Sequence, residues 1–193
     1  MIIGITGGSG CGKTTLLKLI REWGGMVLDC DEIYHRLLKT DKALLKSIDA
    51  RFPGTVEGGV LDRKKLGAIV FNDKQALLEL NKLAHGAVKQ EVLRQLENKP
   101  ALAAIDAIGL FEGGLAELCK PTVAITAPME DRVRRLVLRD GISEEYARSR
   151  INAQRSQEEF VALCDVHLEN NGTQAEFREK CLAFLEGLGI MKP

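Results

Sequence analysis

The sequence predicts an α/β fold in which helices cover a parallel sheet, and three features near its start carry that prediction. Residues 1–6, MIIGIT, form a short apolar, β-branched run that ends in glycines, which indicates a buried strand entering a tight turn. Apolar residues then follow helical spacing over 14–23, and Gly24-Gly25 ends that pattern. A second short apolar run at 26–28 completes a strand-helix-strand unit, and such units join parallel strands.

The middle of the chain has a different character, because residues 32–98 show helical patterns and no convincing strand. The apolar residues at helical spacing there include Leu77, Leu80, Ala84, Val88, Val92 and Leu96. Residues 52–59, FPGTVEGG, are expected to form a loop. So long a helical stretch exceeds an ordinary crossover between two strands. We therefore expect one domain, 1–193, with an inserted helical subdomain at 32–98.

The second half of the chain returns to alternating strands and helices. Strands are expected at 101–106, 122–126 and 164–168, and helices in the polar, arginine-rich stretch 129–155 and at 174–188.

The composition excludes several classes of protein. Of 193 residues, 45% are hydrophobic and 28% charged, with 27 basic and 27 acidic residues and a formal net charge of zero. That balance argues against a nucleic-acid partner, and no apolar run is long enough to span a membrane. The start of the chain does not look like a signal peptide. Five cysteines without a CxxC pair suit neither a disulfide framework nor a zinc site, so we expect a soluble, reduced, cytoplasmic protein.

Residues 7–14, GGSGCGKT, satisfy the phosphate-loop pattern G-x-x-x-x-G-K-[ST] in full. Glycines let backbone N–H groups point inward at phosphate oxygens, and the following helix adds its dipole. Lys13 is expected to reach the β- and γ-phosphates of ATP, and the Thr14 hydroxyl to ligate Mg²⁺. The nucleotide-binding residues are expected to be Gly8, Gly10, Cys11, Gly12, Lys13, Thr14 and Thr15. A chance match is the alternative, but the pattern sits between an expected strand and helix, as the mechanism requires.

A phosphate loop alone leaves GTPases, switch ATPases and small-molecule kinases open. Residues 106–109, DAIG, fit the DxxG pattern of GTPases by letters, and 81–84, NKLA, resemble the base-reading NKxD pattern. Position 84 is alanine, however, so the carboxylate that reads guanine is missing, and the two segments come in the wrong order. The sequence therefore disfavours a GTPase.

Two carboxylates follow the second expected strand and favour a kinase. Asp29 and Asp31 come at the carboxyl edge of the sheet, where open α/β folds bind ligands. Asp31 there can accept the proton of an acceptor hydroxyl or orient it. The alternative is that Asp31 is the N-cap of a helix at 32–38.

Seven arginines fall within a segment that contains no lysine, namely Arg132, Arg134, Arg135, Arg139, Arg148, Arg150 and Arg155. Guanidinium groups suit phosphate oxygens, so we expect a lid at 128–156 that delivers positive charge to the transferred phosphoryl group. Arg135 and Arg139 are four residues apart and share one helix face, which makes them the preferred lid residues. The alternative is a solvated helix whose acidic neighbours neutralise the arginines.

Taken together, these motifs resemble the dephospho-coenzyme A kinase family over nearly the whole chain. The segments that carry the resemblance are IGITGGSGCGKTT at 3–15, LDCD at 28–31, RLVLRDG at 135–141 and RINAQ at 150–154. The resemblance implies a P-loop core with a parallel five-stranded sheet, a helical coenzyme A-binding subdomain and a mobile lid. It also implies ATP-dependent phosphorylation of the ribose 3′-hydroxyl of dephospho-coenzyme A. A nucleoside or nucleotide kinase of the same architecture and a regulatory ATPase without an acceptor stay open as alternatives.

Three segments depart from the family pattern. His85-Gly86 stands where the family has His-Pro, which keeps the imidazole but loses a rigid helix start, and a substrate contact by His85 competes with a helix-surface role. Residues 106–110, DAIGL, lack the family's proline turn; Asp106 either holds a metal-bound water near the substrate or only ends its strand. Residues 164–172 match the family's adenine segment at Asn170 and Gly172. The partner expected is a small-molecule substrate, bound by a monomer or weak homo-oligomer.

Overall fold

The computed structural model describes residues 1–190, and it divides into two compact units. We call them the core unit (residues 1–28, 100–110 and 115 onward) and the helical unit (residues 29–99 and 111–114). Each unit has its own packed interior and is described by itself.

The core unit is built on a five-stranded parallel sheet with the strand order β2-β5-β1-β6-β7. The strands are β1 (Ile2–Thr6), β2 (Met26–Asp29), β5 (Ala103–Asp106), β6 (Thr122–Thr126) and β7 (Val166–Glu169). β1 pairs with β5 on one side and β6 on the other, and β6 pairs with β7, all in parallel. The predicted α/β fold with a parallel five-stranded sheet is therefore confirmed.

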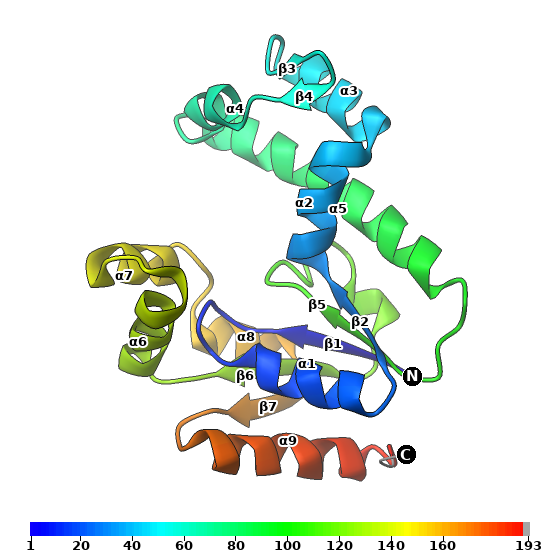
Figure 1. The fold of residues 1–193 in the computed structure, drawn as a ribbon, viewed down its shortest axis with the longest axis vertical. Helices are drawn as coiled ribbons and strands as arrows, with labels where there is room; N and C mark the ends of the chain where they lie inside the picture. The colour runs from blue at the N-terminus through cyan, green and yellow to red at the C-terminus, as the bar shows by residue number, and fades with distance from the viewer. Residues whose placement is uncertain (191–193) are drawn as a thin grey trace. The chain divides into compact units, whose positions relative to one another are not determined.

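Helices α1 (Lys13–Glu22) and α9 (Gln174–Gly187) pack against each other and share one apolar cluster with the sheet. Because side chains alternate along a strand, Ile3 and Ile5 of β1 both join this cluster. Figure 1 shows α1 in front of the sheet and α8 (Gln157–Leu163) behind it. The core unit also contains the 3₁₀ turn η1 (Ala116–Leu118) and helices α6 (Met129–Asp140) and α7 (Glu144–Asn152).

The helical unit packs three helices around a long one, α5 (Lys74–Leu96). The three are α2 (Cys30–Thr40), α3 (Lys42–Arg51) and α4 (Arg63–Val70). Each of these four helices begins after an aspartate whose carboxylate accepts two backbone N–H groups of the first turn, namely Asp29, Asp41, Asp62 and Asp73. Such caps satisfy amide groups that have no partner inside the helix, and they fix where each helix starts.

The prediction that residues 32–98 contain no strand was wrong. Strands β3 (Val56–Glu57) and β4 (Val60–Leu61) form a small antiparallel hairpin inside the segment expected to be a loop. Gly58 and Gly59 make the turn with φ values of 58° and 80°, and two central residues in this left-handed region suit a tight hairpin. Two-residue strands are too short to give a periodic pattern, which is why the sequence did not reveal them.

Two other predicted boundaries also need correction. Helix α2 starts at Cys30, earlier than expected, and its N-cap is Asp29, so the alternative that Asp31 caps it was wrong. The arginine-rich stretch is two helices, α6 and α7, separated at Gly141, whose φ of 66° ends α6. Glycine reaches that left-handed conformation without steric cost, which makes it a common helix terminator.

Candidate active site

The phosphate loop connects β1 directly to α1, as its sequence predicts. Gly7, Gly10 and Gly12 have φ values of 139°, 80° and 100°, a region that side chains with a Cβ rarely adopt. Gly12 is the N-cap of α1 and has no side chain to satisfy the first amide groups of the helix. The positive end of the α1 dipole therefore faces the loop and favours an anion there.

Three side chains from much later in the chain each donate a hydrogen bond to a carbonyl oxygen of this loop. The pairs are Arg132 Nε with Ser9 (2.9 Å), Arg135 Nη1 with Gly10 (3.1 Å) and Asn170 Nδ2 with Cys11 (2.9 Å). In a trans peptide a carbonyl group and the next N–H group point in opposite directions. The N–H groups of Gly10 and Gly12 therefore point to the other side of the loop, where neither has an acceptor within residues 1–190. This arrangement leaves them available to an anion.

A fourth side chain, Gln154, binds the loop through both of its amide atoms. Its Oε1 accepts a hydrogen bond from Ser9 N and its Nε2 donates one to Ser9 Oγ, both at 2.8 Å. Gln154 lies just after α7, so the end of the arginine-rich segment is attached to the phosphate loop in this structure.

The lysine of the phosphate-loop pattern lies beside a carboxylate at the end of β5. Lys13 Nζ donates to the Gly7 carbonyl oxygen at 3.0 Å and lies 3.8 Å from Asp106 Oδ1. Both side chains are mostly buried, at 15% and 13% exposure, so screening by water is weak. The structure thus brings together two residues that the sequence had placed in separate motifs.

The remaining loop residues differ in their surroundings. Cys11 is buried, and burial raises the pKa of its thiol, although the neighbouring Lys13 opposes that effect. A buried thiol with a raised pKa is a weak nucleophile. Thr14 is exposed in the first turn of α1, and Thr15 beside it is half-buried. The Thr14 hydroxyl is thus accessible to a ligand from solvent.

Six of the seven arginines of the arginine-rich segment divide into two groups. Arg132 and Arg135 face the phosphate loop from α6. Four others form ion pairs with acidic neighbours, namely Arg134 with Asp131, Arg139 with Asp140, Arg148 with Glu130 and Arg150 with Asp140. Arg135 and Arg139, the preferred lid residues, therefore contact different partners: Arg135 binds the loop, and Arg139 binds Asp140.

Asp140 is the acid with the most altered titration in this segment. Hydrogen bonds from Arg139, and then from Arg150, lower the pKa of its carboxyl group to about 2. The carboxylate is therefore ionised at neutral pH and holds Arg139 on an exposed part of α6, where the arginine side chain is 62% exposed.

Asn170 and Gly172, expected near the adenine, have other contacts in the structure. Asn170 is buried; its side chain binds the phosphate loop, and its Oδ1 has no hydrogen-bond partner among the described residues. Gly172 precedes α9, and a Cβ at this position would crowd Glu176, which forms the capping box of that helix with Thr173. These contacts account for both residues within the protein itself.

The helical unit contains two further residues of the predicted site. Asp31 lies in the first turn of α2 with an exposed side chain, and no described residue hydrogen-bonds to its carboxylate. His85 lies within α5 and is half-buried, so His85-Gly86 is not at a helix start and the expected loss of a rigid start was wrong. A proline there would interrupt this helix, whereas Gly86 has open space around its Cα.

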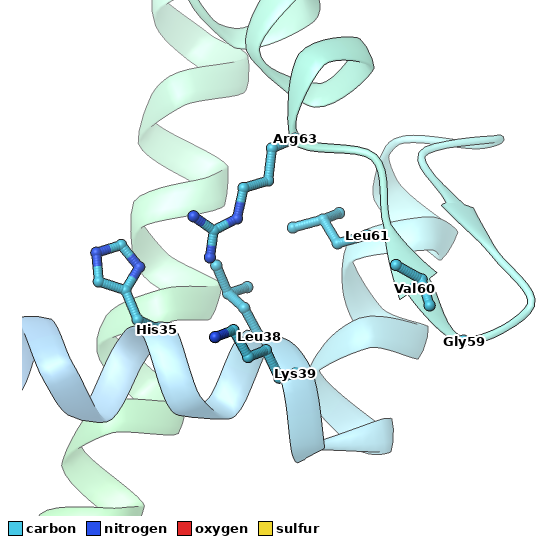
Figure 2. A pocket seen from close by; sticks show the side chains of 7 residues that line it. All are labelled: His35, Leu38, Lys39, Gly59, Val60, Leu61 and Arg63. Carbon is cyan, nitrogen blue, oxygen red and sulfur yellow. The ribbon is translucent and has the colours of Figure 1, made fainter.

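The helical unit also has a pocket of about 500 Å³ between α2, β4 and the start of α4. Figure 2 shows Arg63 extending from the start of α4 into the space above α2, on which His35 and Lys39 lie. None of these three forms an ion pair with a residue of the described chain. The apolar residues of the lining are Leu38, Val60 and Leu61. The pocket thus combines positive charge with an apolar wall and has no acidic side chain in its lining.

Two side-chain contacts with the phosphate loop, those of Arg132 and Gln154, were not predicted from the sequence. Arg132 lies three residues before Arg135 and therefore on the same helix face, so the helical period offered a signal that was not used. Gln154 belongs to the RINAQ segment that carried the family resemblance, but no role had been given to it.

The fold and this loop define the class of protein, which is that of the P-loop kinases. The profile of the family described as dephospho-CoA kinase matches residues 1–176. A dephospho-CoA kinase of Geobacillus kaustophilus is 36% identical over 192 residues, which cover 96% of each chain. The chain belongs to the dephospho-CoA kinase family.

Solved structures agree with this assignment. A crystal structure of a Thermus thermophilus protein matches with a TM-score of 0.83 and 34% identity over 97% of both chains. A dephospho-CoA kinase from Campylobacter jejuni matches with a TM-score of 0.69 and 28% identity over 98% of both. The protein is therefore a transferase that uses ATP to phosphorylate dephospho-coenzyme A in coenzyme A biosynthesis. No helix within residues 1–190 is both long enough and apolar enough to cross a bilayer.

Proposed function

We propose that the two units divide the reaction, with ATP held by the phosphate loop of the core unit and dephospho-coenzyme A by the helical unit. The phosphoryl group would pass to the ribose 3′-hydroxyl, as the family resemblance implies. The observation that carries the proposal is the geometry of the loop. An anion there can accept hydrogen bonds from the N–H groups of Gly10 and Gly12, and the Lys13 ammonium lies at the same loop. Phosphoryl transfer depends mainly on such positioning and charge, because the protein has little covalent chemistry to perform.

Lys13 is proposed to bind the β- and γ-phosphates, with Asp106 keeping its amine in place until the nucleotide arrives. The donor set also fits Mg²⁺, since Thr14 offers an exposed hydroxyl and Asp106 a carboxylate, and both are hard oxygen donors. The described residues contain no group of three or more acidic, histidine or cysteine side chains able to hold a metal ion. The phosphates themselves would thus supply most of the ligands, and Mg²⁺ would neutralise charge on the transferred group.

Asp31 is proposed to orient the acceptor hydroxyl and accept its proton. Two observations support this role: its carboxylate is exposed and without a hydrogen bond in the described chain, and Asp29 has already taken over the helix cap. Asp31 also follows the carboxyl end of β2, the edge at which parallel α/β sheets bind their ligands.

The pocket of the helical unit is proposed to bind the rest of the acceptor. Dephospho-coenzyme A carries a diphosphate and a long pantetheine arm. His35, Lys39 and Arg63 offer positive charge and hydrogen-bond donors for the diphosphate. Leu38, Val60 and Leu61 offer apolar surface for the arm. A guanidinium group that has no carboxylate partner is well suited to a planar pair of hydrogen bonds with phosphate oxygens. His85 remains a second proposed contact of the same unit.

The arginine-rich segment is proposed to act as a lid that closes over ATP. Closure excludes water and so suppresses wasteful hydrolysis. Arg139 would then leave Asp140 for a phosphate oxygen, while Arg135 stays on the loop. The exposed position of the Arg139–Asp140 pair means that this exchange costs little free energy, since exposed ion pairs contribute little to stability.

An acceptor panel tests the proposal. The purified protein is incubated with ATP-Mg²⁺ and dephospho-coenzyme A, adenosine, AMP or no acceptor, and products are identified by mass. We expect coenzyme A and ADP from the first acceptor and little product from the others. Faster turnover of adenosine or AMP would contradict the proposal, and rapid ADP formation without an acceptor would indicate an ATPase.

All five cysteines are free thiols, which supports a reducing cytoplasm. We propose a monomer or weak homo-oligomer, which sedimentation would test.

A further inference from the structure

Arg132 is a buried cation directly beneath the phosphate loop. Only 3% of its surface is exposed, and its Nε donates to the Ser9 carbonyl oxygen at 2.9 Å. Its Nη2 lies against Gly8, so closely that a Cβ at that position would overlap it. The backbone of Arg132 is also close to the loop, because a Cβ on Gly10 would lie 2.7 Å from the Arg132 carbonyl oxygen.

The charge of Arg132 has no counter-charge in the described chain. It forms no ion pair with an acidic residue of 1–190, and its buried Nη2 has no hydrogen-bond partner there. Other arginines of α6 behave differently, since Arg134 and Arg139 each pair with a neighbouring aspartate. Burial lowers the pKa of Arg132, which is the expected effect of removing a charge from water without compensation.

We infer that Arg132 is a positioning residue for ATP whose missing counter-charge is the polyphosphate of the bound nucleotide. Its hydrogen bond holds the Ser9 carbonyl oxygen on the side of the loop that faces α6. The N–H group of Gly10, which belongs to the same peptide, therefore points to the opposite side, toward the anion. The uncompensated charge of Arg132 lies against the same loop and adds to the attraction, because charges interact strongly where water is excluded. This inference rests on the proposed function only in taking ATP as the ligand of the loop.

The test compares Arg132→Met with Arg134→Met, a matched change on the same helix whose side chain is 69% exposed. Binding of ADP and of adenosine is measured by calorimetry, and unfolding of the nucleotide-free protein by a thermal melt. We expect Arg132→Met to weaken ADP binding by about tenfold or more, as for loss of a charge-assisted contact, and Arg134→Met to leave it unchanged. Adenosine binding and the nucleotide-free Tm should change little in both variants, since adenosine has no phosphate and Met fills similar space.

Two results would overturn the inference. One is ADP affinity within about twofold of the parent protein in Arg132→Met, and the other is an equal loss of ADP and adenosine binding with a lowered Tm, which indicates a merely structural arginine. Failure of the parent protein to bind ADP would instead contradict the proposed function itself.

A second measurement uses the contact between Arg132 and Gly8. Gly8→Ala should weaken ADP binding because the new methyl group displaces the guanidinium. In an Arg132→Ala background, where that space is empty, the same change should have a smaller effect. Additive losses in the double variant would show that the two residues act independently.

Discussion

Lys13 Nζ lies 3.8 Å from Asp106 Oδ1 and at the same time donates a hydrogen bond to the Gly7 carbonyl oxygen at 3.0 Å. The amine is thus fixed between the ends of two neighbouring strands, β1 and β5. An ammonium held in this way needs little rearrangement when phosphate arrives, and such preorganisation lowers the cost of binding and of reaching the transition state.

Lys13→Ala should lower turnover by about 10²-fold or more, because the ammonium acts on the charge of the phosphates as they transfer. The Tm should fall little, since the side chain is not part of the apolar core. Lys18→Ala, on an exposed position of the same helix, is the control and should keep full activity. Near-normal turnover of Lys13→Ala in a steady-state assay would show that the role given to this loop is wrong.

Asp31→Asn should reduce turnover by about 10²-fold while ATP affinity and Tm stay the same, because the amide cannot accept the hydroxyl proton. The structure sharpens this prediction, since the helix cap is Asp29 and Asp31 has no capping role to lose. Glu32→Gln removes an adjacent exposed carboxylate and is the matched control. If both variants turn over normally, Asp29 becomes the carboxylate to examine.

Arg139→Lys should be nearly as damaging to turnover as Arg139→Ala, because lysine retains the charge but not the planar pair of donors. Stability should be unaffected, since the pair with Asp140 is exposed. Steady-state kinetics and a melt on both variants check this. If Arg139→Lys retains activity, Arg139 contributes only positive charge, and Arg135 becomes the arginine to test for paired hydrogen bonds to phosphate.

Arg63→Gln should raise the KM for dephospho-coenzyme A by about tenfold and leave the KM for ATP unchanged, because a charged hydrogen bond to the diphosphate is lost. Lys64→Gln removes a positive charge from the next residue of α4, which does not line the pocket. An equal effect of the two changes would mean that only the overall charge of this surface matters.

Glu91 should make the helical unit sensitive to acid. Hydrogen bonds from Arg94 chiefly, with Gln95 and the charge of Arg36, lower its pKa from 4.5 to about 2. A pKa lowered by folding contributes stability that is complete above pH 4.5 and is lost as the pH falls toward 2.

Glu91→Gln should therefore unfold at lower urea than the parent protein at neutral pH, with the difference shrinking below pH 4.5. Urea unfolding at several pH values measures this, and Glu32→Gln serves as the control. A difference that is constant across the pH range would show that the ion pairs of Glu91 contribute nothing to stability.

Much of the architecture could be predicted because the signals are local. The phosphate loop is encoded in eight contiguous residues, and the glycines at 7, 10 and 12 are where the backbone needs a positive φ. Four of the five strands are short, mainly apolar runs with clear ends, so the parallel sheet followed from the pattern. The resemblance to the dephospho-CoA kinase family rested on the same contiguous motifs and is confirmed.

Short-range signals failed in two situations: where neighbouring residues satisfied the same rule, and where an element was too short to show a pattern. Asp29 and Asp31 are both good helix caps by type, and only the backbone decided that Asp29 takes the two amide groups. The hairpin at 56–61 is held by cross-strand pairing between two-residue strands, and no periodicity can appear over that length.

The sequence by itself determined the phosphate loop, the parallel sheet and the family, because each depends on residues adjacent in the chain. Only the tertiary structure decided which side chains hold that loop. The bonds from Arg132, Gln154 and Asn170 span 123, 145 and 159 residues. Seven arginines look alike in a sequence, and their contacts separate only when α6 packs on the loop, which buries Arg132, brings Arg135 to the loop and leaves Arg139 with Asp140. Burial and proximity are properties of the packed chain, and they decide which arginine contacts the loop and which stays in water.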